Sequence, residues 1–417
     1  MTTAFTPLDP ASLPGSRELL DTRRAARARF EEGPLPTEAD EIWRYSRIGE
    51  LDPGAWTPAP APDGSAVPAG VAPLLEHVGR RSGLAVTVDG YLVHHDGDTG
   101  GARIVPAGGG IDALSTAAEP WDAFAELNTA QAPSPLVVEV PSGGVVEDPL
   151  VICHWAATGE SAAFPRVIVR VGEGAEITVI EYHASGPVRA WVDPVTELHV
   201  ADGGRLTHVT VQELGPAVWQ TAFLAADVGR DASLRTANVA LGGDYARVRT
   251  DSRVTGAGGS AELLALYCGS AEQMHDFRTL QDHVGPKSTS TLLFKGAVAD
   301  EARSAYSGLI RIRRGAAGTS ALQTNRNLIL SDTGLASYSV PNLDIEENDV
   351  TCSHASATGP IDAEQRFYLE SRGVPPEVAD RLIVLGFFAE VVGRLPSPGL
   401  RAHLSQVIGT KLGVTRG

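Results

Sequence analysis

A cysteine and a histidine stand two residues apart near the C-terminal end of the chain, in the segment VTCSHASATG at 350–359. If this segment is a β-strand, Cys352 and His354 point to the same face, and Ser353 points to the other. A thiolate and an imidazole suit zinc, copper or an iron–sulfur cluster. A cluster usually takes about four ligands, so this pair would need other residues or another chain. The alternative is a small buried cysteine beside a hydrogen-bonded histidine, and the sequence leaves both interpretations open.

Two other places pair residues of the same kinds with weaker signals. Glu181 and His183 are two apart, but nothing in the sequence marks them off from other polar strand residues. Cys153 and His154 are adjacent and would point to opposite faces of a strand. The chain has three cysteines, Cys153, Cys268 and Cys352, and their odd number and wide spacing do not suit a disulfide framework. The chain has no G-x-x-x-x-G-K loop, G-x-S-x-G elbow or paired CxxC, so we expect no nucleotide hydrolysis of its own.

The elements that would position these residues repeat at a regular interval. From about residue 136, short β-rich runs alternate with glycine-containing turns, and no long helical pattern occurs before about 361. The intervals between successive turns are 31, 29, 28, 26, 30, 28 and 28 residues, with turns at Val140, Val171, Val200, Val228, Val254, Val284, Ile312 and Val340. A repeat that is all β predicts a parallel β-helix, whereas the turns of a β-sandwich need not hold a long register.

Helical patterns flank this repeat. Ser16 can cap a helix over 17–32, and Gly33 can end it; a proline- and alanine-rich connector follows at 52–70. After the repeat, Asp362 can cap a helix that ends at Gly373, and prolines 375 and 376 open a second one. That second helix is apolar around nearly its whole circumference, so it must be buried in its own core or against a partner. A third helix is predicted to start at 397–398.

The chain therefore divides into three predicted parts. They are an N-terminal helical and mixed region at 1–135, a β-helix core at 136–357 and a C-terminal helical region at 358–417. A net charge of −17 argues against nucleic acid or an anionic membrane as a partner, since both attract basic surfaces. The N-terminus lacks the pattern of a signal peptide, and no stretch approaches the roughly 20 apolar residues of a membrane span, so we expect a cytoplasmic protein.

Two segments resemble a known family. The C-terminal segment at 348–392, NDVTCSHASATGPIDAEQRFYLESRGVPPEVADRLIVLGFFAEVV, resembles the signature of the SufB/SufD family of iron–sulfur cluster assembly proteins. EIWRY at 41–45 resembles a segment found early in the SufD members. The resemblance covers nearly the whole chain and implies a right-handed parallel β-helix between N-terminal and C-terminal helical regions. The repeat interval leads independently to the same β-helix.

The resemblance also implies partners and a site. Family members SufB and SufD form a heterodimer through their β-helices, and each holds a subunit of the ATPase SufC through its C-terminal helices. His354, with Cys352 beside it, would then face SufB at a transient iron–sulfur cluster shared by both chains. SufB has a functional cysteine before this segment, whereas residues 329–350 here contain none, which favours the SufD branch and a non-enzymatic subunit. We expect the SufC contacts to come from Phe367, Tyr368, Arg372, Leu382, Leu385 and Phe388.

Two other classes of function fit a β-helix. One is a carbohydrate-active lyase or hydrolase, which is usually secreted and which the N-terminus disfavours. The other is a homo-oligomer that carries metal. The sequence leaves open whether the cluster is [2Fe–2S] or [4Fe–4S], whether a flavin binds, and whether the chain forms a homodimer when SufB is absent.

Overall fold

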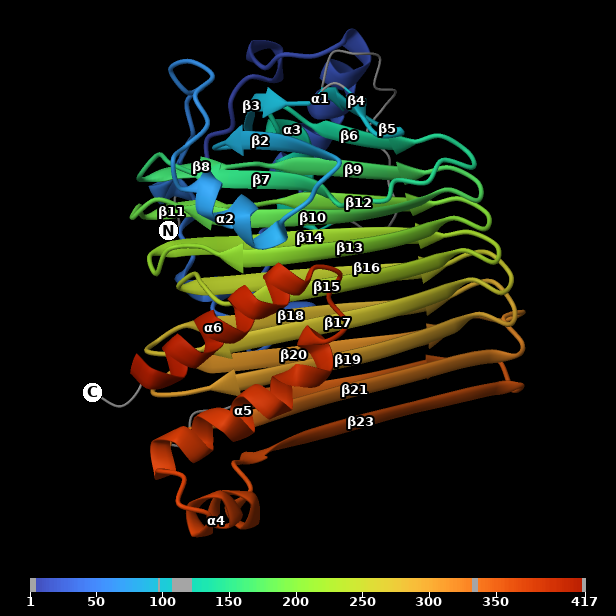
Figure 1. Cartoon of the computed structure of the whole chain (residues 1–417). Coiled ribbons are helices and arrows are strands. Elements are labelled where there is room, and N and C mark those ends of the chain that lie inside the picture. The colour runs from blue at the N-terminus through green and yellow to red at the C-terminus, as the bar shows by residue number, and fades with distance from the viewer. Residues whose placement is uncertain (1–4, 97, 107–121, 332–336, 415–417) are drawn as a thin grey trace.

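Two large β-sheets face each other and form the body of the molecule (Figure 1). The computed structural model describes residues 5–96, 98–106, 122–331 and 337–414. Sheet A has the path β4 (Asp98–Thr99), β5 (Ala102–Pro106), β6 (Leu136–Val140), β9 (Arg166–Val171), β12 (Val195–Val200), β14 (Val218–Val228), β16 (Tyr245–Val254), β18 (Met274–His283), β20 (Arg303–Ile312) and β22 (Ser337–Ile345). Three short strands lie beside this path, β1 (Thr57–Pro58), β8 (Ser161–Ala163) and β11 (Ala190–Val192).

Sheet B is made from the strands that alternate with those of sheet A along the chain. Its order is β3 (Tyr91–His95), β2 (Gly83–Val88), β7 (Leu150–Ala156), β10 (Glu176–Ser185), β13 (Arg205–Glu213), β15 (Ser233–Ala240), β17 (Ser260–Gly269), β19 (Thr289–Val298), β21 (Thr319–Ile329) and β23 (Val350–Pro360). From β6 and β7 onward the described strand pairs are parallel, and the chain makes a solenoid of about eight turns. The predicted β-helix is confirmed, and β2 and β5 add strands from before residue 136.

The predicted repeat corresponds to one row of residues across sheet A. Val140, Val171, Val200, Val228 and Val254 are successive register partners. The row then continues through His283, Ile312 and Ile345. The turn predicted at Val284 begins one residue after this row, whereas the turn predicted at Val340 is wrong because a valine–proline pair was taken as a turn. Pro341 instead lies inside β22, an edge strand, which is where sheets tolerate proline.

Side chains alternate between the interior of the solenoid and its outer faces. On β10, Ile177 and Val179 join the inner core, whereas Ile180 and Tyr182 point outward and are buried under helices. This is the two-residue alternation of a strand with both faces covered. Consequently, polar residues at the odd-numbered positions 181 and 183 must lie inside the solenoid.

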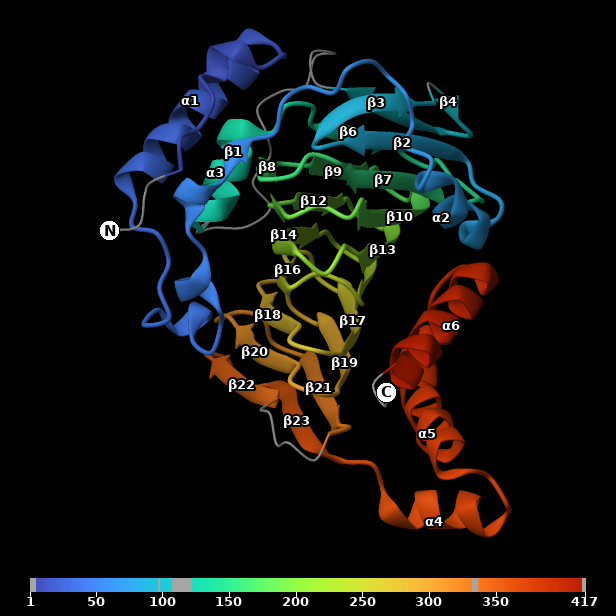
Figure 2. The same cartoon turned by 90° about the vertical axis from the view of Figure 1, so that its left-hand side faces the viewer.

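Helices cover the two outer faces from opposite sides (Figure 2). They are α1 (Arg17–Glu32), α2 (Val71–Val78), α3 (Ala123–Gln131), α4 (Ala363–Ser371), α5 (Pro376–Val392) and α6 (Pro398–Val414), and short 3₁₀ turns lie at Pro10–Ser12, Glu41–Trp43, Ile48–Glu50 and Pro53–Ala55. On sheet A, Trp43 and Phe124 from the N-terminal segments pack with Trp191 and Trp219. On sheet B, α2, α5 and α6 pack on the outward residues, while α4 stands away from the sheets (Figures 1 and 2).

The helix ends agree with the sequence predictions. The hydroxyl of Ser16 accepts from the backbone N–H of Leu19, and Asp362 accepts from those of Glu364 and Gln365. Gly373 follows α4 with a φ of 85°, the left-handed conformation that glycine adopts without cost. Among the described helices, none is both long enough and apolar enough to cross a membrane.

Candidate functional site

Cys352 lies on β23, the last strand of sheet B, and faces the interior of the final rung. The side chain is half-buried and packs in a small cluster that includes Ile312 and Ala321. Burial raises the pKa of its thiol, so the sulfur is protonated at neutral pH unless a cation favours the thiolate. The site thus holds a potential soft ligand in its protonated form.

His354 follows two residues later on the same strand and is exposed. Its register partner on β21 is Gln323, as Ala321 is that of Cys352, so both side chains belong to the inward-facing row. Across the described part of the chain, no hydrogen bond or ion pair engages the imidazole, and no third cysteine, histidine or carboxylate completes a metal group with these two. The structure places Cys352 and His354 together at the open end of the solenoid.

The end of the solenoid exposes two unpaired strand edges. β22 closes the path of sheet A, and β23 closes that of sheet B. The β22 side chains Tyr338, Val340, Leu343 and Ile345 are 36–42% exposed. Exposed apolar edge strands are templates for pairing with another chain, and native proteins usually protect them. The geometry therefore suits a second β-structure docked over His354.

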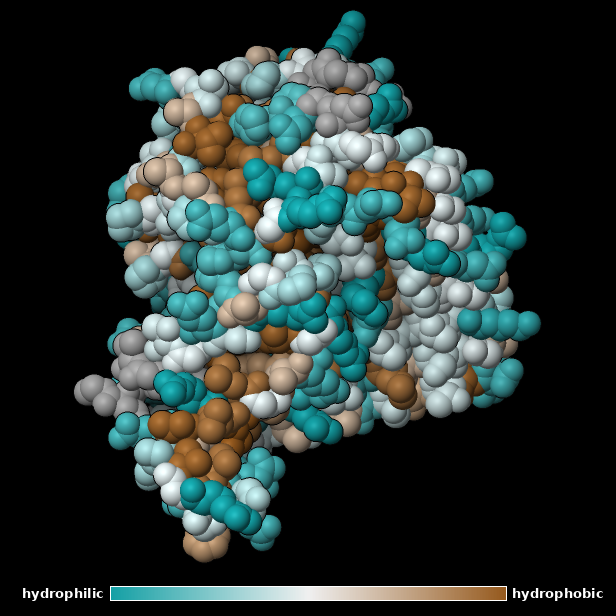
Figure 3. Space-filling view, in the orientation of Figure 1, coloured by the Kyte–Doolittle hydropathy of each residue, from teal (hydrophilic) through white to brown (hydrophobic). Residues whose placement is uncertain are grey.

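The C-terminal helices form a second exposed apolar surface. Phe367 and Tyr368 on α4 are 72% and 58% exposed, and Leu382 on α5 is 47% exposed. Tyr368 and Leu382 line a groove between α4 and α5, which also holds Leu369 and Ile383. Figure 3 shows apolar residues gathered over this part of the molecule. The helical arm, as we name α4 with the facing side of α5, is thus open to a partner.

Not every residue expected at this surface lies on it. Phe388 is fully buried and packs with Val384 against the outer face of sheet B, so it holds α5 in place and offers no contact to a partner. Leu385 is partly buried in the same cluster. Arg372 places its guanidinium 5.4 Å from the centroid of the Tyr368 ring and remains at the surface. The helix α5, which the sequence predicted to be apolar on all sides, therefore packs one side against sheet B and exposes the other.

A buried polar cluster inside the solenoid is the main feature that sequence reasoning missed. The Glu181 carboxylate lies 3.0 Å from Nε2 of His183, 2.9 Å from Nε2 of His208 and 3.3 Å from Nε2 of His154. Burial opposes the charge of Glu181, but the three neighbouring histidines hold its pKa well below the usual range. A signal was present in the sequence, because His154 and His183 are 29 residues apart, which is one rung, and His208 lies one rung after Val179, two residues before Glu181.

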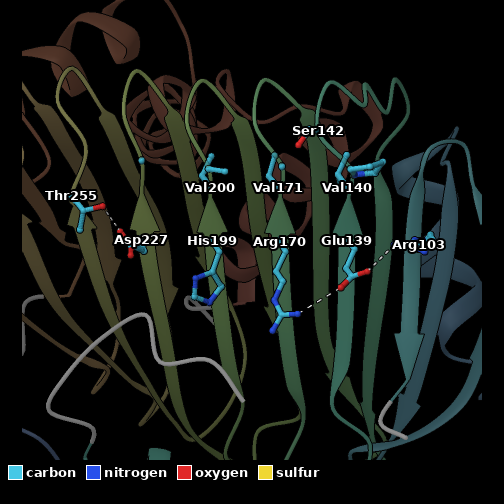
Figure 4. A pocket seen from close by; sticks show the side chains of 14 residues that line it. Arg103, Glu139, Val140, Ser142, Arg170, Val171, His199, Val200, Asp227 and Thr255 are labelled. Atoms are coloured by element: carbon cyan, nitrogen blue, oxygen red, sulfur yellow. Dashed lines mark hydrogen bonds and ion pairs between the residues drawn. The ribbon is translucent and has the colours of Figure 1, made fainter. Parts of the chain in front are cut away.

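A row of largely alternating charge crosses the outer face of sheet A, and its first five residues, from Arg103 to Asp227, line a groove (Figure 4). Each strand adds one register partner, and the row is Arg103, Glu139, Arg170, His199, Asp227, Arg253, Asp282, Arg311 and Asp344. Neighbours pair with each other, as Glu139 does with Arg103 at 3.2 Å and with Arg170 at 3.6 Å. Since opposite charges largely alternate along the row, we assign it to cross-strand pairing.

Comparison with known proteins decides the family. The family model described as "SUF system FeS cluster assembly, SufBD core domain" matches residues 154–387, which span most of the solenoid and most of the helical arm. The chain belongs to the SufBD family. The resemblance carried by residues 348–392 and 41–45 is therefore confirmed.

Relatives of this SufBD-family protein align over most of its length. An iron–sulfur cluster assembly SufBD family protein of Mycobacterium tuberculosis is 35% identical over 91% of this chain and 90% of its own. The iron–sulfur cluster assembly protein SufD of Escherichia coli is 28% identical over 91% of this chain and 89% of its own. SufD of Bacillus subtilis is 30% identical over 66% of this chain and 63% of its own. The chain is thus SufD-like within its family.

Proposed function

We propose that this protein is a SufD-like, non-catalytic subunit of a SufBCD-type iron–sulfur cluster assembly complex in the cytoplasm. The observation that carries the proposal is the open end of the solenoid, where two unpaired strand edges flank His354 and Cys352. A SufB chain docked there would cover the exposed apolar side chains of β22 and supply the missing ligands. The cluster is cargo, held for a time between the two chains.

Within this proposal the chain's own residues have separate roles. The exposed imidazole of His354 offers a nitrogen ligand, and the thiol of Cys352 becomes a ligand when a bound cation displaces its proton. ATP hydrolysis belongs to SufC, because the chain has no phosphate-binding loop. Family membership favours this role over that of a carbohydrate-active enzyme. A homodimer through the same edges is the form we expect when SufB is absent.

Replacing His354 with alanine tests the site. We expect the complex with SufB and SufC to form normally, while cluster assembly falls by at least about tenfold, because an exposed ligand is lost without loss of packing. The measurement is co-expression of the three chains, size exclusion, and iron and sulfide analysis of the complex. Ser353→Ala, on the opposite face of the same strand, is the matched control and should assemble clusters like the wild type. Unchanged assembly in His354→Ala would rule out this site.

A second pair of variants tests the helical arm. Replacing Phe367 and Leu382 together by serine should weaken SufC binding by more than about tenfold, because exposed aromatic and aliphatic anchors dominate such interfaces. The fold and SufB pairing should be retained, since neither side chain belongs to the buried core. Val145→Ser, at a residue 59% exposed in the turn before β7, is the control. Calorimetric titration with SufC measures the effect, and equal affinities for the double variant and the control would refute docking on this arm.

A further inference from the structure

We propose that the buried cluster of His154, Glu181, His183 and His208 is a binding site for one divalent transition-metal ion, Zn(II) or Fe(II), inside the solenoid. We name these four residues the inner cluster. It lies on β7, β10 and β13, far along the solenoid from the open end formed by β22 and β23. The proposal concerns an ion resident in this chain and is independent of the proposed partners.

Strand register brings the inner cluster together. Glu181 and His183 are two apart on β10 and share its inner face, and His183 is the register partner of His154 on β7. His208 lies on β13 opposite Val179, one inward position before Glu181. All four side chains are at most 3% exposed. Three consecutive rungs thus direct three imidazoles and a carboxylate into one place in the core.

The donor atoms converge as ligands do. Three Nε2 atoms lie 2.9–3.3 Å from the carboxylate, and the candidate ligand atoms of His154, Glu181 and His183 all lie within 4.8 Å of one another. Small shifts of these side chains would let their donor atoms surround an ion at about 2.0–2.2 Å, the length of zinc–nitrogen and zinc–oxygen bonds. A set of three imidazoles and one carboxylate suits Zn(II) and Fe(II).

Hydrogen bonds alone account poorly for this cluster. In the described ranges, Nε2 of His154 lies 3.3 Å from the Glu181 carboxylate yet makes no hydrogen bond. The His154 and His183 rings stack with centroids 4.8 Å apart, so protonating both would place like charges together. A single divalent ion neutralises the carboxylate and uses the Nε2 lone pairs of neutral rings.

The surroundings supply an outer shell of hydrogen bonds. The Thr87 hydroxyl lies 2.7 Å from Nδ1 of His154, which sets the orientation of that ring. The Thr196 hydroxyl, from the facing sheet, donates to both oxygens of Glu181 at 3.1 and 3.2 Å. Metal-binding histidines and carboxylates usually have such outer partners. A small cavity of about 20 Å³ beside His183 and Thr196 gives room for one water as an additional ligand.

Because the inner cluster is sealed, the ion must enter as the chain folds. The test is therefore to express the full chain alone in medium supplemented with Zn(II) or, separately, Fe(II), and to measure bound metal by mass spectrometry after purification. We expect about one ion per wild-type chain and at least about tenfold less in Glu181→Gln. Glu197→Gln is the matched control, since Glu197 is equally buried but pairs with Arg166 outside the inner cluster. It should retain the ion, as should His354→Ala.

A second measurement does not depend on any variant folding. Wild-type protein is unfolded in urea and refolded with either ZnCl₂ or EDTA, and the melting temperatures of the two samples are compared. A bound ion should raise the melting temperature of the zinc sample, because an ion that binds only the folded state stabilises it. The proposal would be overturned if wild-type protein contained no metal after either supplement and if the zinc and EDTA samples melted at the same temperature. The inner cluster would then be held by hydrogen bonds alone. Metal retained by Glu181→Gln or lost from His354→Ala would overturn it too, by placing the ion elsewhere.

Discussion

The Asp276→Ala variant is expected to lose about 3–5 kcal/mol of unfolding free energy, because it leaves buried guanidinium groups without their counterion. Asp276 is fully buried on the outer face of sheet A. It accepts hydrogen bonds from Arg247 at 2.8 Å and from Arg278 at 2.6 Å, and both arginines are almost completely buried. The Tyr245 hydroxyl donates to the same carboxylate at 2.8 Å. One carboxylate therefore satisfies three buried donor groups.

The same arginines hold the N-terminal segment on the sheet. Arg247 donates to the carbonyl of Ile42 at 2.9 Å, and Arg278 donates to that of Arg44 at 2.7 Å. These carbonyls belong to the segment at 41–45 that resembles early SufD sequence. Without Asp276 the guanidinium groups lose their fixed positions, so we also expect faster amide hydrogen exchange in this segment.

Urea unfolding at pH 7 and hydrogen exchange together check this prediction. Glu176→Ala is the control, since Glu176 pairs with Arg205 at 3.5 Å across two strands of sheet B with both side chains exposed. An exposed pair contributes at most about 1 kcal/mol, so the control should remain close to wild type. Equal losses of unfolding free energy in the two variants would show that burial does not strengthen the interactions of Asp276.

Asp276 also makes stability depend on pH. Burial opposes its charge, but Arg247 and Arg278 hold its pKa below the usual range. When the folded pKa of an acid lies below its unfolded pKa, the stabilisation is complete above the unfolded pKa and is lost as pH falls through the folded one. Melting temperatures measured from about pH 6 down to pH 3 should therefore fall at the acid end for the wild type. Asp276→Asn should show a flatter acid end, and an identical slope would contradict the assignment.

The Gly256→Ala variant is expected to lose about 3 kcal/mol or more, because the added methyl group meets backbone atoms that cannot move aside. A Cβ at Gly256 would lie 1.9 Å from the backbone nitrogen of Arg230 and 2.2 Å from the carbonyl carbon of Gly229. Those atoms belong to the preceding turn of the solenoid, and the N–H of Gly256 donates to the carbonyl of Val228 at 3.1 Å. Relieving the clash would separate two rungs where they are hydrogen-bonded.

Thermal and urea unfolding measure this effect, with Gly159→Ala as the control. Gly159 also lies in a turn, has nothing within 4 Å of the added Cβ, and does not have a positive φ. That variant should stay within about 0.5 kcal/mol of wild type. A Gly256→Ala protein as stable as the control would mean that adjacent turns are less closely packed than the structure indicates.

The sequence by itself determined the solenoid and the helix ends, because both depend on local patterns. The valine row from Val140 to Val254 has nearly constant spacing, and each rung must contact the next at that spacing. Ser16 and Asp362 cap helices through atoms two or three residues away. Interactions of such short range in sequence can be predicted without knowing what packs above them. Pro341 misled the repeat because its tolerance depends on β22 being an edge.

Only the tertiary structure decided which polar and apolar residues are buried, and against what. Phe388 and Phe367 are both phenylalanines in predicted helices. Phe388 is fully buried against sheet B, whereas Phe367 is 72% exposed on the helical arm. Glu181 looked like any polar strand residue until the rungs were stacked and three histidines met its carboxylate. The physical reason is that strand spacing specifies which residues are neighbours along the solenoid. Packing of the facing sheet and the covering helices sets which of those neighbours are sealed from water.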